Sequence, residues 1–287
     1  MQPKFGNLNI PNLEHALLDS FIVPGFLQTS LGIDSSALFA DLQDTAPWTD
    51  PSDPDFKYRG NELARRKAFL VTSTDPVPKT DEEPSVMPKY SYPGWQNASM
   101  RSYRDMRTVP SLHKVVERIK QELLYNDRPV NINHAILTCY RGADDNIGYH
   151  SDKMRDIQRD TPIVSLSLGE EREFHIGRLD PKKNQDTITT HRFVLRPGDL
   201  FILGPMTNAA YRHSIVPVHQ ESLIQRDPSV EVGPRISIVL RDIRSMITRE
   251  EARKRAARTE KNRRGQIRKT AGKVKAATKA RRTSQKK

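Results

Sequence analysis

A histidine and an aspartate stand two residues apart in the run NIGYHSDKMRD, as His150 and Asp152. In an extended chain, residues i and i+2 point to the same side. Imidazole and carboxylate together are ligands that suit iron. A His-x-Asp pair on its own is more often a solvated polar turn, because the pattern recurs by chance. A metal site therefore needs a third ligand from another part of the chain.

The run AYRHSIVPV supplies a second histidine, His213, on another predicted strand. Two histidines and one carboxylate form the facial triad of non-haem Fe(II) oxygenases, which leaves coordination positions open for a co-substrate and dioxygen. A hydrolytic zinc site can use the same ligand types. The three residues alone leave the choice between these metals open.

Two arginines, Arg235 and Arg241, lie six residues apart in PRISIVLRDI and project to the same face of a predicted strand. The apolar residues Ile236, Ile238 and Leu240 project to the other face. Taken alone, the strand fits exposed edge arginines. Beside a metal triad, buried arginines fit a small dicarboxylate better, because guanidinium binds carboxylate in a bidentate fork. Six residues span roughly 20 Å, so we expect the two arginines to serve opposite ends of the ligand region.

The elements that must position these residues change in type along the chain. A short helix capped near Ser35 or Ser36 is expected after the strand-like run FIV and a Pro-Gly turn. A second helix begins at Pro110, and its apolar stripe predicts core packing. From residue 133 onward, short β-like runs alternate with turns, which favours a sandwich or jelly roll with the helices on its outer face.

Composition restricts the class of protein. The chain has 287 residues, enough for one substantial core, and one cysteine, Cys139, which excludes an internal disulfide and favours a reducing compartment. We expect no secretory signal and no membrane span. The segment from residue 249 to 287 holds 17 lysines and arginines against three glutamates, whereas the rest of the chain is close to neutral. This distribution favours an appended arm that binds polyanions.

In this combination of motifs the chain resembles the AlkB-like Fe(II)- and 2-oxoglutarate-dependent dioxygenases. The resemblance runs from about residue 21 to residue 243 through the motifs VPGFL, YRGADDNIGYHSD, IVSLSLGEEREF, PGDLFILG, RHSIVP and PRISIVLR. It implies an α+β, mainly β fold: a double-stranded β-helix (jelly-roll) core with N-terminal supporting helices. We expect an N-terminal extension over residues 1–14, the dioxygenase domain over 15–245 and a basic tail, disordered or helical, over 246–287.

The resemblance also implies a role for each site residue. It makes His150, Asp152 and His213 the ligands of Fe(II). Residues implied to bind the co-substrate 2-oxoglutarate are Arg235, which pairs with the distal carboxylate, Arg241 near the metal end, Tyr140, and Thr138, which stands where the family usually has an amide. Dioxygen is the third reactant.

A nucleotide-recognition lid is implied for about residues 60–108, with Tyr90, Tyr92 and Trp95 as the side chains that cover the substrate base. A loop packed on the barrel is the alternative for each ring. Family members that demethylate nucleic acid often carry an acidic residue one or two places after the triad aspartate. Here those places hold Lys153 and Met154, and we expect Asp156 to reach the same space.

The implied function is oxidative demethylation of alkylated nucleic acid, DNA or RNA, with release of formaldehyde, succinate and CO2. Two alternatives stay open: a hydroxylase or demethylase of protein side chains, and a nucleic-acid-binding protein with an inactive barrel. We expect a monomer in the nucleus or the cytoplasm, with no membrane partner.

The tail is expected to begin as a helix, because Thr248 and Glu251 form a capping-box pattern. Beyond this start it has no apolar stripe, and repulsion between like charges favours an extended chain. A sequence-independent tether for nucleic acid is the functional interpretation. A nuclear-import signal or a solubility tail is the alternative.

Overall fold

The computed structural model describes residues 3–49, 57–58, 61–62, 65–72, 84–89, 103–180, 186–218, 222–224, 227, 229–251, 253–254, 257–258 and 261–262. Within this part of the chain, no helix is long and apolar enough to cross a membrane. The predicted lid residues Tyr90, Tyr92 and Trp95 lie outside the described residues.

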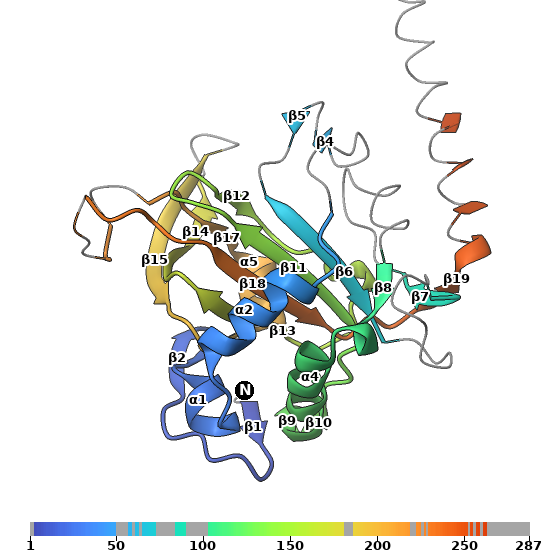
Figure 1. The fold of residues 1–287 in the computed structure, drawn as a ribbon, viewed down its shortest axis with the longest axis horizontal. Helices are drawn as coiled ribbons and strands as arrows, with labels where there is room; N and C mark the ends of the chain where they lie inside the picture. Colours follow the sequence, from blue (N-terminus) through green and yellow to red (C-terminus); the bar gives the residue numbers. More distant parts are fainter. Residues whose placement is uncertain are drawn as a thin grey trace, which may run out of the picture.

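Two β-sheets form the core of the described chain (Figure 1). The larger sheet has eight strands, antiparallel except for the last pair. In spatial order they are β2 (Glu14–Leu17), β3 (Ser20–Val23), β16 (Leu200–Leu203), β13 (Ile163–Gly169), β18 (Arg235–Arg241), β11 (His134–Tyr140), β6 (Arg66–Val71) and β8 (Tyr103–Asp105). The smaller antiparallel sheet consists of β12 (Ile147–His150), β17 (Arg212–Ile215), β14 (Arg172–Leu179) and β15 (Thr187–Leu195). This mainly β architecture fits the predicted jelly-roll core.

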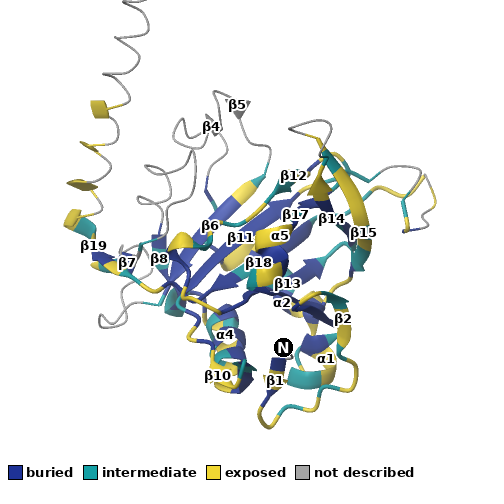
Figure 2. Cartoon of the chain, turned by 180° about the vertical axis from the view of Figure 1, so that it is seen from behind, coloured by how far each residue is buried: buried dark blue, intermediate teal, exposed yellow. Residues whose placement is uncertain are grey.

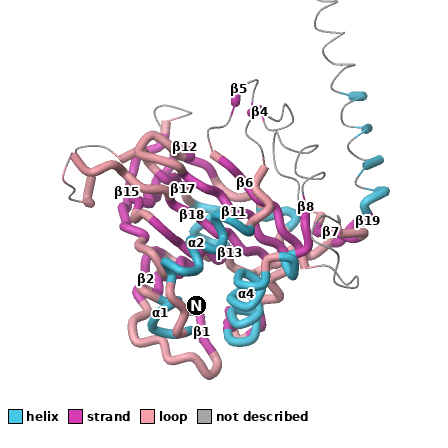
Figure 3. Tube along the Cα trace, viewed as in Figure 1, coloured by secondary structure: helices cyan, strands magenta, loops and turns pink. Residues whose placement is uncertain are grey.

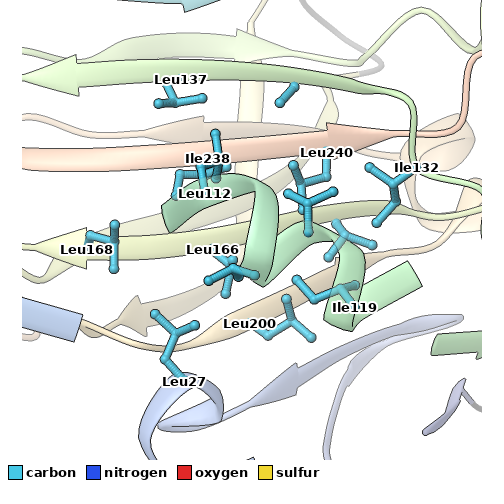
Figure 4. Close-up of a cluster of buried hydrophobic side chains, with 14 of the residues drawn as sticks. Leu27, Leu112, Ile119, Ile132, Leu137, Leu166, Leu168, Leu200, Ile238 and Leu240 are labelled. Atoms are coloured by element: carbon cyan, nitrogen blue, oxygen red, sulfur yellow. The ribbon is translucent and has the colours of Figure 1, made fainter. Parts of the chain in front are cut away.

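Helices cover the outer face of the larger sheet, as the sequence predicts (Figure 3). The helix α4 (Pro110–Glu122) has proline in its first turn, and its apolar stripe is fully buried. Figure 4 shows Leu112 and Ile119 of this helix among the side chains of β11, β13, β16 and β18. The helix α1 (Phe26–Leu31) follows the Pro-Gly turn at Gly25, whose φ of 59° is left-handed.

The helix α2 (Ser35–Thr45) also packs on this face, through Leu38 and Leu42. Its cap is Asp34, whose carboxylate accepts hydrogen bonds from the backbone N–H groups of Ser36 and Ala37. The cap predicted at Ser35 or Ser36 was therefore wrong by one or two residues. The physical reason is that a carboxylate and a hydroxyl cap a helix almost equally well, so a run of Asp-Ser-Ser does not reveal which residue does so.

Alternate residues of the central strands serve two different cores. Ile236, Ile238 and Leu240 of β18 belong to the core between the sheet and the helices. The residues between them face the smaller sheet, where a second buried cluster lies. Burial of both faces makes these strands almost continuously buried (Figure 2). Cys139 of β11 lies in the outer core, on the face opposite Tyr140.

Two expected boundaries differ in the structure. Strands β6 and β8 fall within the region predicted as a lid, but both are paired in the larger sheet. The apolar residues on both faces of β6, such as Phe69 and Leu70, explain its place, because such a strand is stable only when both faces are covered. In the N-terminal extension, β1 (Pro3–Phe5) pairs with β9 (Leu123–Tyr125), which also pairs with β10 (Arg128–Pro129).

The start of the basic tail is tied to the lid region. The strand β19 (Met246–Thr248) pairs with β7 (Val86–Pro88), and Arg249 donates hydrogen bonds to the carbonyls of Ser85 and Pro84. The capping box is formed: the backbone N–H of Thr248 donates to Glu251, and that of Glu251 donates to the Thr248 hydroxyl. The described residues after Thr248 are helical.

The remaining short elements are α5 (Pro205–Ala210), the 3-10 turns η2 (Met106–Thr108) and η3 (Met154–Asp156), and the pair β4 (Lys57–Tyr58) and β5 (Asn61–Glu62).

Candidate active site

A cavity lies between the inner faces of the two sheets. Its lining combines apolar side chains, such as Ile136, Phe174 and Phe201, with polar groups that converge on one region. Those polar residues include His150, Asp152, His213, Thr138, Tyr140, Arg235 and Arg241. The fold thus brings all seven residues predicted for metal and co-substrate into one cavity.

The two histidines form a cross-strand pair in the smaller sheet. His150 at the end of β12 is directly opposite His213 of β17, with ring centroids 4.3 Å apart. Asp152 follows two residues after the strand. One ligand atom from each of the three residues lies within 4.8 Å of the others. This is the geometry of three side chains that can share one metal ion.

Hydrogen bonds to the backbone hold the segment that carries His150 and Asp152 in place. The side chain of Asn208 in α5 accepts from the N–H of Asp152 and donates to its carbonyl, each at 2.9 Å. Ser151 donates to the carbonyl of Tyr211 at 2.9 Å. Nδ1 of His150 lies 2.8 Å from the carbonyl of Gly148, so the ring donates there and presents Nε2 with a free lone pair. Metal sites commonly orient their ligands in this way.

The charge states also suit metal binding. Burial, assisted by His150 and Arg241, lowers the pKa of His213 to about 3, so this ring is neutral at physiological pH. Burial alone would raise the pKa of Asp152, but the charge and hydrogen bond of Arg241, together with His213 and His150, more than offset burial and hold that pKa well below its usual value. Nη2 of Arg241 lies 2.8 Å from Oδ2 of Asp152. A neutral imidazole and an ionised carboxylate are the forms that bind a metal cation.

Arg235 presents an unsatisfied guanidinium to the other end of the cavity. Only 1% of the residue is exposed, and burial lowers its pKa to about 10, so it stays charged. Nη2 donates to the Ser167 hydroxyl at 2.9 Å, whereas Nε and Nη1 are buried and have no hydrogen-bond partner in the described part of the chain. A carboxylate bound in a bidentate fork at either edge of this guanidinium would give one of these two nitrogens its partner. The residues present therefore fit the distal carboxylate of 2-oxoglutarate.

The co-substrate end is built by strand register. Tyr140 of β11 is directly opposite Arg235 of β18, and the centre of the guanidinium lies 5.4 Å from the tyrosine ring. One row further along, Thr138 is opposite Ser237. Arg241 lies at the far end of the same strand, beside Asp152. The two arginines serve opposite ends of the cavity, as their spacing predicts.

Asp156, predicted to contact the substrate, is placed elsewhere. It is buried in η3, its Oδ1 lies 3.5 Å from Nε of Arg155, and it is not among the residues that line the cavity. The 3-10 turn explains this, because it breaks the two-residue alternation that would have carried Asp156 to the side of Asp152. Three other histidines do not line the cavity and have side-chain partners elsewhere: Tyr103 for His134, Glu173 for His175 and Thr190 for His191.

Sequence reasoning missed two residues of the site. Lys67 of β6 lines the cavity, and Asn208 fixes the backbone of Asp152. A signal for Lys67 was the alternation in RKAFLV, where Lys67, Phe69 and Val71 share one face. The only sequence signal for Asn208 is that it lies close to His213 along the chain.

Similarity to known proteins agrees with this site. The family model described as the 2OG-Fe(II) oxygenase superfamily matches residues 21–241. The chain therefore belongs to the 2OG-Fe(II) oxygenase superfamily. This membership favours iron over zinc at the triad, and it confirms at the level of the family the class of enzyme predicted from the sequence.

Individual relatives are more distant. The DNA oxidative demethylase ALKBH2 of Mus musculus is 28% identical over 137 residues, which are 47% of this chain and 51% of the relative. ALKBH2 of Homo sapiens is 27% identical over 113 residues, 39% of this chain and 40% of the relative. The chain thus spans about half the length of these relatives or less. Their names support the AlkB-like resemblance.

Two solved structures were also found. The structure of OsALKBH1 has a TM-score of 0.44 and 16% identity, covering 80% of this chain and all of that one. A prolyl hydroxylase from Trichoplax adhaerens, in complex with a peptide fragment of hypoxia inducible factor, has a TM-score of 0.39 and 12% identity, covering 82% and 85%.

Replacement of Asp152 tests the metal site. We expect Asp152→Ala to lose Fe(II) binding in oxygen-free calorimetry, because two neutral imidazoles alone lack the anionic ligand. We also expect about 3–5 kcal/mol less stability towards denaturant, because the change removes the carboxylate that the buried Arg241 bonds. Asp144→Ala, at an exposed position, is the control and should change neither. Fe(II) affinity that is the same in Asp152→Ala and the wild type would contradict the assignment.

Replacement of Arg235 tests the co-substrate end. Arg235→Lys keeps the charge but loses the fork, and we expect the concentration of 2-oxoglutarate needed for half-maximal turnover to rise roughly ten- to hundredfold. The requirement for methylated substrate should change little. Arg118→Ala on the exposed face of α4 is the control. If only the requirement for methylated substrate rose, Arg235 would belong to the substrate site instead.

Proposed function

We propose that this protein is an Fe(II)- and 2-oxoglutarate-dependent dioxygenase that oxidatively demethylates N-methylated bases in nucleic acid. The observation that carries the proposal is the unsatisfied, buried edge of Arg235 in the same cavity as the triad of His150, Asp152 and His213. A metal site alone fits many reactions. A metal site with a dedicated carboxylate anchor fits a reaction in which a dicarboxylate is consumed at the metal.

The residues divide the work of such a reaction. When bound, Fe(II) and 2-oxoglutarate would supply the oxidising chemistry with dioxygen as the oxidant: one oxygen atom of O2 would enter succinate as CO2 is lost, and the other would hydroxylate an N-methyl group, which then leaves as formaldehyde. Arg235 orients the co-substrate through its distal carboxylate. Arg241 keeps Asp152 ionised and aligned. The apolar lining of Phe174, Phe201 and its neighbours excludes water from the reacting groups.

Nucleic acid is the proposed substrate for two reasons. The curated relatives are DNA oxidative demethylases, although the similarity covers only part of their length. The tail from residue 249 to 287 also carries 17 basic residues against three glutamates. The strand β19, directly before this segment, pairs with β7 in the region proposed as the lid, so nucleic acid held by the tail would be held close to that region. DNA and RNA both fit this argument, and so do a nuclear location and a monomeric state.

Coupled product formation tests the function. Purified protein with Fe(II) and 2-oxoglutarate should form succinate and formaldehyde in equal amounts on oligonucleotides that carry N-methylated bases. Methylated peptides of the same length and charge are the matched comparison. Product on the peptides alone would replace the proposal with a protein hydroxylase or demethylase. Binding of nucleic acid without product from either substrate would point to an inactive barrel.

Truncation tests the tail. We propose deletion of residues 252–287, because this keeps β19, the contacts of Arg249 with the lid region and the capping box intact. We expect weaker binding to long oligonucleotides and a shallower dependence on salt, since fewer phosphates are neutralised. Turnover on a short methylated oligonucleotide should stay nearly unchanged. If neither the affinity for long nucleic acid nor its salt dependence changes, nuclear import or solubility becomes the better account of the tail.

A further inference from the structure

The backbone of Asp152 has a side chain where a strand would have a neighbouring strand. The strand β12 ends at His150, opposite His213, and the described residues 151–153 belong to no strand. The carboxamide of Asn208 accepts from the N–H of Asp152 and donates to its carbonyl, each at 2.9 Å. Two residues directly opposite each other in an antiparallel pair exchange the same two hydrogen bonds. One side chain of α5 thus does for this metal ligand what a strand does for His150.

The start of α5 is held by a residue from a distant part of the chain, Asp19, between β2 and β3. Oδ2 of Asp19 accepts from the N–H of Met206 at 2.8 Å, and Oδ1 accepts from the N–H of Thr207 at 2.9 Å. N–H groups in the first turn of a helix have no partner within the helix. The residue at the cap position is Gly204, which has no side chain to accept from them. Asp19 therefore acts as the cap of α5.

The Asp19 carboxyl group fits closely against this helix. A β-carbon at Gly204 would overlap that carboxyl group, so a larger residue has no space there. The N–H of Gly204 donates to the hydroxyl of Ser20 at 3.0 Å, and the hydroxyl of Thr207 lies 2.8 Å from Oδ1 of Asp19. Asp19 itself is 2% exposed, and its carbonyl accepts from the hydroxyl of Tyr125 at 3.1 Å. These contacts join α5 firmly to the turn between β2 and β3.

Only a short stretch of chain separates Asp19 from the metal site. Thr207, which bonds Asp19, is followed directly by Asn208, which bonds Asp152. Asn208 is 2% exposed, so its two hydrogen bonds are shielded from water. A shift of the first turn of α5 would therefore move the carboxamide, and with it the backbone of Asp152.

We propose that Asp19 and Asn208 are positioning residues of the metal site, and that α5 transmits the position of Asp19 to Asp152. Neither side chain is among the described residues that line the cavity, so both act at a distance from metal and substrate. Their effect is to hold the carboxylate of Asp152 where it can share one metal ion with His150 and His213. This inference rests on the metal site of the proposed function and extends that site to the N-terminal strand pair.

A purely structural role is the alternative, because loss of a helix cap destabilises any fold. Asp34 provides the matched comparison. Its carboxylate also caps a helix, α2, by accepting from the N–H groups of Ser36 and Ala37. The helix α2 packs on the outer face of the larger sheet and contributes no described residue to the lining of the cavity. Asp34→Ala therefore removes a cap without affecting the connection to the metal site.

The test measures Fe(II) binding by calorimetry in the absence of oxygen, 2-oxoglutarate and methylated substrate. The variants are Asn208→Ser, Asn208→Leu, Asp19→Asn, Asp19→Ala and the double variant that combines Asp19→Asn with Asn208→Ser. Asp34→Ala is the control. Thermal unfolding checks that each variant is folded. The absorption spectrum of Co(II), bound in place of Fe(II), reports the geometry of the ligands without any need for turnover.

We expect Asn208→Ser and Asn208→Leu to weaken Fe(II) binding roughly ten- to hundredfold, because each removes the two bonds to the backbone of Asp152. Asp19→Ala should weaken it about tenfold. Asp19→Asn should have a smaller effect, because an amide keeps one acceptor oxygen. Each of these four variants should also alter the Co(II) spectrum. Asp34→Ala should change neither the affinity nor the spectrum.

The double variant tests whether Asp19 acts through Asn208. If it does, the double variant should bind Fe(II) no more weakly than Asn208→Ser alone, because the connection is already broken there. Losses of affinity that add in the double variant would show two independent effects and overturn the inference.

Two further outcomes would overturn the inference: wild-type Fe(II) affinity in a folded Asn208 variant, or an equal loss of affinity in Asp34→Ala, which would make the effect one of general stability. Asp152→Ala separates these outcomes from failure of the metal site itself. If Asp152→Ala loses Fe(II) while the Asn208 variants keep it, the metal site stands and only the inference fails. If Asp152→Ala keeps wild-type affinity, the metal site fails and the inference fails with it.

Discussion

The ion pair between Arg241 and Asp152 joins the two sheets at the place where the chemistry is proposed. Arg241 ends the central strand of the larger sheet, and Asp152 follows the first strand of the smaller one. Their side chains are 4% and 10% exposed. Burial of two charges is costly and is repaid only by close geometry and further hydrogen bonds. Such a pair adds little net stability, but it fixes the position of a ligand. Each buried charge would be strongly destabilising if the other side chain moved away.

Arg241 positions Asp152, and the place of Arg241 depends in turn on the alternation of side chains along β18. One face of the strand supplies Ile236, Ile238 and Leu240 to the core under the helices, and the other supplies Arg235 and Arg241 to the cavity. A slip of one residue in register would send both arginines into the apolar core. The packing that stabilises the fold therefore also fixes the spacing between the carboxylate anchor and the metal site.

The parts of this structure that could be predicted are those encoded by local pattern. The stripe of α4, the two faces of β18 and the spacing of His150 and Asp152 all follow from helical or strand periodicity. Lys67 was missed and Asp156 was placed wrongly, because the positions of both residues depend on tertiary structure. Lys67 enters the cavity only because β6 pairs with β11, and Asp156 leaves it because the chain turns directly after Asp152. The role of Asn208 requires that α5 packs against that turn, which no local pattern reveals.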